Sequence, residues 1–225
     1  MSSSPTAPTS TTASSSSSPS PADADRSGRV AVLACGAIAL HIADIARRRQ
    51  WELDVQPLPP LLHNHPQRIA PEVEAHLAGL VSAYEKVVVG YADCGTYGAL
   101  DAVCERHGIA RLPGLHCYDL FAGADRIEGW LAEQPGTFFL TDFLVKSFDR
   151  TVWRELGLDR YPQLHEDYFR HFTRVIWLAQ DPDGDLRVEA DRVAALLRLP
   201  LTVVTTGDGA LESALAVLME SPRDT

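Results

Sequence analysis

Basic residues are scarce in this chain of 225 residues, where 20 Lys and Arg stand against 30 Asp and Glu and the formal net charge is −10. An acidic surface repels the phosphates of nucleic acids and of anionic lipids, so no nucleic-acid partner is expected. No apolar run approaches the roughly 20 residues that cross a bilayer, and the N-terminal segment lacks the basic start and apolar stretch of a secretory signal. We therefore expect a cytoplasmic protein with no membrane partner.

Cysteine is also infrequent, with four residues at Cys35, Cys94, Cys104 and Cys117. Their spacing matches no CxxC or HExxH signature, and the glycine turn after Cys35 lacks the later glycines of a dinucleotide fingerprint. A chain of this length without an export signal is typical of a reducing compartment. Free thiols, either catalytic or metal-bound, are therefore favoured over disulfides.

Large apolar residues are absent from the N-terminal segment after Met1, which consists almost entirely of Ser, Thr, Pro and Ala. Such a segment cannot bury enough surface to offset the entropy of ordering. We predict a disordered tail over residues 1–28 and a single α/β domain over residues 29–221.

Short apolar runs within that domain alternate with segments whose apolar residues recur at helical spacing. Strands without tight hairpins between them favour a mostly parallel, doubly wound sheet of the Rossmann or flavodoxin type, with helices on both faces. The strands are predicted at residues 30–34, 52–58, 86–91, 109–112, 138–140, 175–178 and 201–204.

Three turns of this predicted sheet carry thiols. Cys35 and Cys94 each precede a glycine at the end of a strand, and His116 and Cys117 follow the strand predicted at 109–112. Turns after parallel strands emerge at the same sheet edge, so these side chains, with Asp142 after a later strand, are expected to meet there.

Thiolate and imidazole groups suit zinc and other transition metals, and catalytic zinc sites supply three protein ligands with one position open. We expect Cys35, Cys94 and either His116 or Cys117 to bind such an ion. Catalytic roles are predicted for Cys94, His116 and Asp142.

Other interpretations use the same residues without a metal. A thiol at a helix start gains from the dipole there, so Cys35 or Cys94 is a candidate nucleophile with His116 as its base; both are otherwise small buried hydrophobes. Cys104 falls inside a predicted helix and is expected to fill the core. Three interpretations apply to Asp142: it positions a substrate, it orients a metal-bound histidine through a hydrogen bond, or, most simply, it is the N-cap of the next helix.

The loop that contains His63 and His65 is rich in proline, which breaks any regular element. It suits either a ligand loop or lid, or an ordinary solvated turn.

Several motifs occur in order along the chain: Ala34-Cys35-Gly36, Leu62-His63-Asn64-His65-Pro66, Tyr91-Ala92-Asp93-Cys94-Gly95, His116-Cys117-Tyr118-Asp119-Leu120-Phe121-Ala122-Gly123 and Gly136-Thr137-Phe138-Phe139-Leu140-Thr141-Asp142-Phe143. Together they resemble the motifs of a bacterial and archaeal family described as a domain of unknown function, DUF1638. The resemblance implies metal binding or thiol chemistry centred on the same cysteines, and an association of some members with corrinoid-dependent methyl transfer. Where many relatives have Tyr-Gly before the second Cys-Gly, this chain has Tyr91-Ala92-Asp93.

The sequence thus leads to the hypothesis of a metal-dependent enzyme, a transferase or hydrolase with a Cys/His-ligated zinc, that acts on a small molecule. Transfer of a methyl or similar group to or from sulfur is the chemistry that most naturally uses a cysteine-rich ion. Two alternatives stay open: a non-catalytic module that binds a metal, a corrinoid or an iron–sulfur centre, and a cysteine-nucleophile enzyme without metal.

Overall fold

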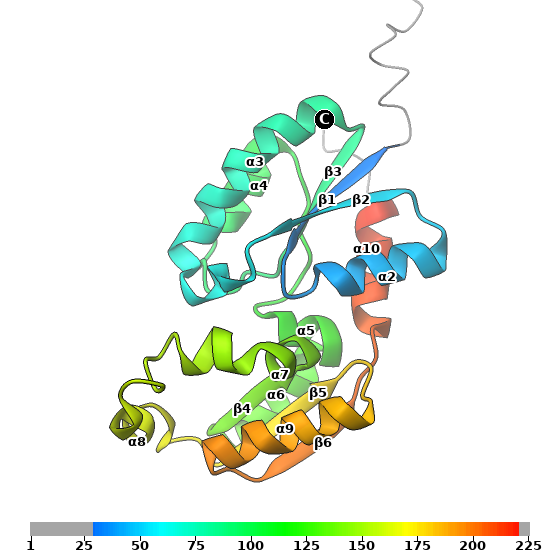
Figure 1. The fold of residues 1–225 in the computed structure, drawn as a ribbon. Helices are drawn as coiled ribbons and strands as arrows, with labels where there is room; N and C mark the ends of the chain where they lie inside the picture. The colour runs from blue at the N-terminus through cyan, green and yellow to red at the C-terminus, as the bar shows by residue number, and fades with distance from the viewer. Residues whose placement is uncertain (1–28, 221–225) are drawn as a thin grey trace, which may run out of the picture.

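The computed structural model describes residues 29–220, which form two parallel three-stranded sheets with the orders β2-β1-β3 and β4-β5-β6 (Figure 1). The predicted α/β class, with parallel strands and helical cover, is confirmed. The strands are shared between two sheets, whereas we expected one. The tail predicted for residues 1–28 lies outside the described residues. The strands are β1 (Val30–Cys35), β2 (Leu53–Leu58), β3 (Lys86–Gly90), β4 (Thr137–Thr141), β5 (Arg174–Ala179) and β6 (Leu201–Thr205).

β1 is the central strand of the first sheet, where Val30 pairs with Leu53 of β2 and with Lys86 of β3. Its residues from Ala31 to Ala34 are all at most 1% exposed, as is typical of a parallel strand covered on both faces. The turn that follows requires Gly36, because a Cβ there would lie 2.4 Å from the carbonyl oxygen of Leu58. The ends of β1 and β2 therefore lie close together.

Helices cover both faces of the first sheet. In Figure 1, α3 (Ile69–Ala83) and α4 (Ala99–His107) lie on one side, with α2 (Ala39–Arg49) and α10 (Gly209–Glu220) on the other. α10 follows the second sheet in the chain, yet it returns to the first, where Leu211, Leu215 and Leu218 join the core around β1. The chain therefore passes between the two sheets twice, once before β4 and once after β6.

The second sheet lies between two apolar clusters, because alternate side chains of its strands point to opposite faces. On β5, Val175 and Trp177 belong to the core with α7 (Asp142–Phe148) and α9 (Gly184–Leu197), whereas Ile176 and Leu178 face the cluster that includes Ile127 of α6 (Ala124–Glu133). Successive side chains of a strand point to opposite faces, so this sheet too is covered on both sides.

The segment after β3 departs from the sequence prediction. Instead of a strand over 109–112, the structure has a single bridge between Val89 and Arg111. Pro113 follows without a backbone N–H, and Gly114 has φ +95°, so the pairing of this segment with strand β3 ends there. The next helix, α5 (Cys117–Ala122), was not predicted, and neither was α8 (His165–Phe169).

The helix after β4, α7, begins at Asp142 and passes into a π-helical segment, Asp149–Trp153. Short 3₁₀ segments follow β2 at Pro60–Asn64 and Pro66–Arg68, and precede α8 at Pro162–Leu164. Among residues 29–220, no helix is both long and apolar enough to span a membrane.

Candidate functional site: a thiol-lined cavity

A cavity of about 620 Å³ is lined by loops of the first sheet and by elements that follow β4 in the second. Three of the four cysteines, Cys35, Cys94 and Cys117, line it. Each comes from a different segment: the end of β1, the loop after β3, and the start of α5. The structure therefore brings three thiols to one cavity, and all four cysteines of the chain are free.

The carboxylate of Asp93 organises the loop that carries Cys94. It accepts hydrogen bonds from the Thr96 hydroxyl at 2.7 Å and from the backbone amides of Gly95, Tyr97 and Gly98 at 3.1, 3.2 and 3.1 Å. Burial alone would raise the pKa of Asp93, but these hydrogen bonds outweigh it and hold the pKa below its ordinary value. An ionised carboxylate thus shapes the turn.

Backbone pairing brings Cys94 next to Cys117. The amide of Asp93 donates to the Gly114 carbonyl at 3.1 Å, and the amide of Cys94 donates to the Leu115 carbonyl at 2.8 Å. Cys94 itself has φ +50°, a left-handed conformation that costs a non-glycine residue free energy. The Cys94 sulfur also accepts a hydrogen bond from the backbone amide of Cys117, so the two thiols share one corner of the cavity.

Burial dominates the electrostatics of the thiols. It raises the pKa of Cys35 despite hydrogen bonds from the amides of Ala37 and Ile38, and, with the neighbouring Cys35, it raises the pKa of Cys94 to about 12. Burial, and after it the neighbouring Cys94 and Cys35, raise the pKa of Cys117 well above its ordinary value. All three are therefore protonated thiols near neutral pH.

Tyr91 completes this corner, and sequence reasoning did not single out its side chain. It is 1% exposed, and its hydroxyl lies beside the Cys35 thiol without a regular hydrogen-bond partner among the described residues. Burial raises its pKa, as do the nearby cysteines. A buried hydroxyl without a partner is uncommon in folded proteins.

His63 lies in the 3₁₀ segment Pro60–Asn64 and lines the cavity. Its Nδ1 is 2.5 Å from the Pro60 carbonyl oxygen. A carbonyl only accepts, so Nδ1 carries the proton and Nε2 keeps a lone pair. Burial lowers the pKa of His63, although the Pro60 hydrogen bond opposes this effect, and the ring is therefore neutral at pH 7.

The remaining predicted residues differ in their positions. His116 and His65 line the cavity at its exposed rim. Asp142 is 3% exposed and does not line it, since its carboxylate accepts hydrogen bonds from Trp177 Nε1 at 2.8 Å and from the Asp181 amide at 2.7 Å. The cap of α7 is instead Thr141, whose hydroxyl accepts from the Leu144 amide at 3.3 Å. Asp142 therefore connects α7 to β5.

The opposite wall of the cavity comes from the second half of the chain and is mostly apolar. Sequence reasoning assigned no role to its residues, although three of them lie in the motifs quoted above, because these mostly apolar side chains carry no group that marks a reactive site. They pack against the second apolar core while also lining the cavity: Tyr118, Phe138, Phe143, Val152 and Leu156.

In the described part of the chain, no three His, Cys, Asp or Glu side chains stand together in ligating positions. The three thiols share the cavity wall without forming a ready-made ligand set. Cys104 is separate: it is 5% exposed on α4 and belongs to the first core, as predicted for a core residue.

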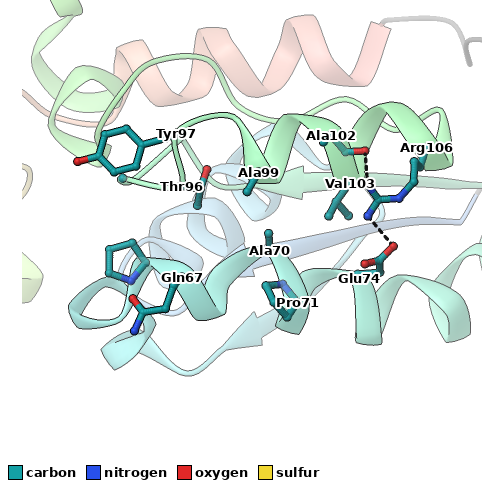
Figure 2. Close-up of a pocket in the computed structure, with 12 residues that line it drawn as sticks. Gln67, Ala70, Pro71, Glu74, Thr96, Tyr97, Ala99, Ala102, Val103 and Arg106 are labelled. Atoms are coloured by element: carbon teal, nitrogen blue, oxygen red, sulfur yellow. Dashed lines mark hydrogen bonds and ion pairs between the residues drawn. The ribbon is translucent and has the colours of Figure 1, made fainter.

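A second hollow of about 670 Å³ lies between α3 and α4 (Figure 2). At one end Arg106 forms an ion pair with Glu74 at 2.8 Å, and at the other Tyr97 is 96% exposed. Pro66 and Gly95 line both this hollow and the thiol cavity. None of the described residues that line this second hollow is a cysteine.

Fold and cavity define an α/β protein with two parallel sheets and a site that combines thiols with a neutral imidazole. The family model described as a protein of unknown function, DUF1638, matches residues 57–215. The chain belongs to this family, as the motifs predicted. The match includes Cys94, His116 and Cys117, whereas Cys35 precedes it. No curated protein and no solved structure matches the chain.

Proposed function

We propose that this chain is a metal-dependent enzyme in which Cys35, Cys94 and Cys117 bind zinc or a similar transition metal as thiolates, beside a cavity for a small substrate. The observation that carries the proposal is the convergence of three thiols from three separate segments on one cavity. Sulfur ligands select zinc and other soft ions, and three protein ligands leave one coordination position open.

The state of the thiols supports a metal over a metal-free nucleophile. A nucleophilic cysteine needs a lowered pKa, whereas burial raises the pKa of all three thiols here. Metal coordination releases the thiol protons, and the positive charge of the ion compensates for burial of the thiolates. Backbone amides already donate to the sulfurs of Cys35 and Cys94, which stabilises thiolate charge.

Coordination requires side-chain rotation, because the described residues do not present three donors in ligating positions. Cys94 and Cys117 lie on neighbouring backbone segments joined by hydrogen bonds. Rotation about the Cα–Cβ bond moves a thiol between staggered rotamers, so the backbone can stay in place.

A bound zinc ion supplies a Lewis acid that holds a substrate thiolate or water. His63 is placed to accept the proton that such a group loses, because its Nε2 carries a lone pair and its Nδ1 is held by the Pro60 carbonyl. Transfer of a methyl or similar group involving sulfur suits a thiolate-rich site best, and hydrolysis by bound water ranks second. We place this activity in the cytoplasm, where free thiols stay reduced.

The test is the metal content of the full chain, purified anaerobically with zinc in the growth medium and measured by plasma mass spectrometry. We expect about one zinc per chain in the wild type and a near-complete loss in Cys94→Ser. Cys104→Ser is the matched control, because Cys104 is buried outside the cavity, and it should retain zinc. Near-zero metal in the wild type would refute the proposal. Visible absorption with little zinc would indicate a corrinoid or iron–sulfur module instead.

A further inference from the structure

The cavity has two walls of different character. On one wall, Cys94 and Cys117 pack against the first apolar core. On the other, Phe138, Phe143 and Val152 pack against the second core. A molecule held at the thiols therefore places its other end on aromatic and aliphatic side chains.

The lining of the cavity contains no lysine or arginine among the described residues; Arg111, which acts on the Cys94 thiol, lies outside the lining and pairs with Asp101 at 2.6 Å. The one carboxylate among these described lining residues is Glu155, which is exposed. Three thiolates around a divalent ion add a net negative charge. A carboxylate or phosphate in this space would lose its hydration without gaining a lysine or arginine of the lining as its partner, which is costly.

The size of the cavity limits the ligand as well. Its volume of about 620 Å³ lies within the range of about 300–1,000 Å³ that is usual for small-molecule sites. A corrinoid with its side chains is much larger than the drug-sized molecules that such sites enclose. The cavity thus favours a compact substrate with one sulfur end and one apolar end.

We propose that the substrate class of this site is an uncharged small thiol with an aliphatic or aromatic substituent, whose sulfur meets the cysteine wall and whose substituent lies against Phe143, Val152 and Leu156. The part of this inference that concerns the substrate's sulfur rests on the proposed function of the cysteines. The part that concerns the apolar substituent rests only on the apolar wall of the cavity. Burial of a short alkyl chain against such a wall strengthens binding about fourfold per CH₂ in general.

The experiment uses the full chain loaded with Co²⁺, whose thiolate charge-transfer absorption reports ligands at the metal. Two thiols of similar length are titrated, butanethiol and the anionic 3-mercaptopropionate. We expect butanethiol to bind at least tenfold more tightly. Phe143→Ala should weaken butanethiol about tenfold and leave 3-mercaptopropionate unchanged. Tyr168→Ala is the matched control, because Tyr168 is 43% exposed on α8, outside the cavity.

A second variant is expected to gain affinity for the anionic thiol, whereas Phe143→Ala loses affinity for butanethiol. Leu156→Arg places a cation in the apolar wall and should bring the affinity for 3-mercaptopropionate up to that for butanethiol or above it. This variant decides the inference if Phe143→Ala does not fold. Equal affinities in the wild type, or tighter binding of the anion, would overturn the inferred substrate class.

Failure of the metal site is recognised separately, as the absence of thiolate charge-transfer absorption in the wild type with Co²⁺. The apolar wall is then tested on metal-free protein by the shift in Tm with the same two thiols. A rise with butanethiol alone supports the apolar wall. No rise with butanethiol overturns it.

Discussion

The side-chain amide of Asn64 donates a hydrogen bond to the Thr151 carbonyl oxygen at 3.0 Å. Asn64 lies next to His63 in the 3₁₀ segment that follows β2, whereas Thr151 lies in the π-helical segment after α7. Both residues line the thiol cavity. The bond therefore joins two segments that line the cavity, one from each half of the chain. Short π-helical segments are frequent at functional sites.

Asn64→Ala removes this connection. We expect it to lower the free energy of unfolding by about 1 kcal/mol, the usual contribution of one hydrogen bond. Urea denaturation measures this effect. Gln67→Ala is the control, since Gln67 is an exposed neighbour; an equal effect of both variants would contradict the role given to Asn64.

Asp93→Asn tests the support of the Cys94 loop. The pKa of Asp93 is held below its ordinary value of about 3.9, so its stabilisation is complete above that pH and disappears as the pH falls through the folded-state pKa. We expect a loss of about 2 kcal/mol at pH 7, as for hydrogen bonds to a charged group. The difference from the wild type should shrink below about pH 4.

Urea denaturation at several pH values measures this dependence. Glu128→Gln serves as the control, because Glu128 is an exposed carboxylate of α6, and it should change stability little at any pH. A constant difference between Asp93→Asn and the wild type down to pH 3 would show that the carboxylate charge is not what stabilises the loop.

Gly36→Ala tests the close approach of β1 and β2. The added Cβ would lie 2.4 Å from the Leu58 carbonyl oxygen and 3.0 Å from Pro60, where the His63 segment begins. We expect a loss of about 2 kcal/mol, as for overpacking, together with weaker metal binding. Gly79→Ala, with no atom within 4 Å of its Cβ, should stabilise α3 by about 0.5–1 kcal/mol. Similar effects of the two substitutions would argue against this contact.

The elements of the fold were predictable because their apolar patterns are strong. The run from Val30 to Ala34 is continuous, as a strand buried on both faces requires, and Ile38, Ile42 and Ile45 recur at helical spacing on the segment that becomes α2. Both patterns depend only on which residues are apolar and on the backbone period. The sequence therefore contains this information locally.

The division into two sheets was not predictable in the same way. Strand order depends on long-range packing. The apolar residues of β4 do not indicate whether this strand pairs with β3 or begins a second sheet. The structural reason lies between them: Pro113 and Gly114 end the pairing of this segment with β3 after a single bridge at Arg111. The chain then forms α5 and α6 before β4 begins.

The neighbours Thr141 and Asp142 show why the cavity could be predicted only in part. Both lie at the end of β4, so sequence position alone predicts a site role equally well for either residue. In the structure Thr141 lines the cavity, whereas the Asp142 carboxylate binds the indole N–H of Trp177. Adjacent side chains point in different directions, and that choice is made by partners distant in the sequence. The apolar wall at Phe143 and Val152 has the same origin.

Thiol alkylation distinguishes the metal site from a cysteine nucleophile. Burial raises the pKa of Cys94 to about 12 and that of Cys104 to about 11. Because the thiolate is the reactive form, a raised pKa predicts slow alkylation at pH 7–8. We expect the rate of iodoacetamide labelling of Cys94 in metal-free protein to keep rising above pH 9, measured for each site by peptide mass spectrometry.

The same protein in urea is the internal control, since unfolded thiols titrate near a pKa of about 8.5 and should all be labelled at similar rates. Cys35 and Cys117 should follow Cys94 in the folded state, because burial raises their pKa as well. A cavity thiol that is labelled rapidly below pH 8 in the folded, metal-free chain would have a lowered pKa. That result would favour a metal-free nucleophile over the thiolate metal site.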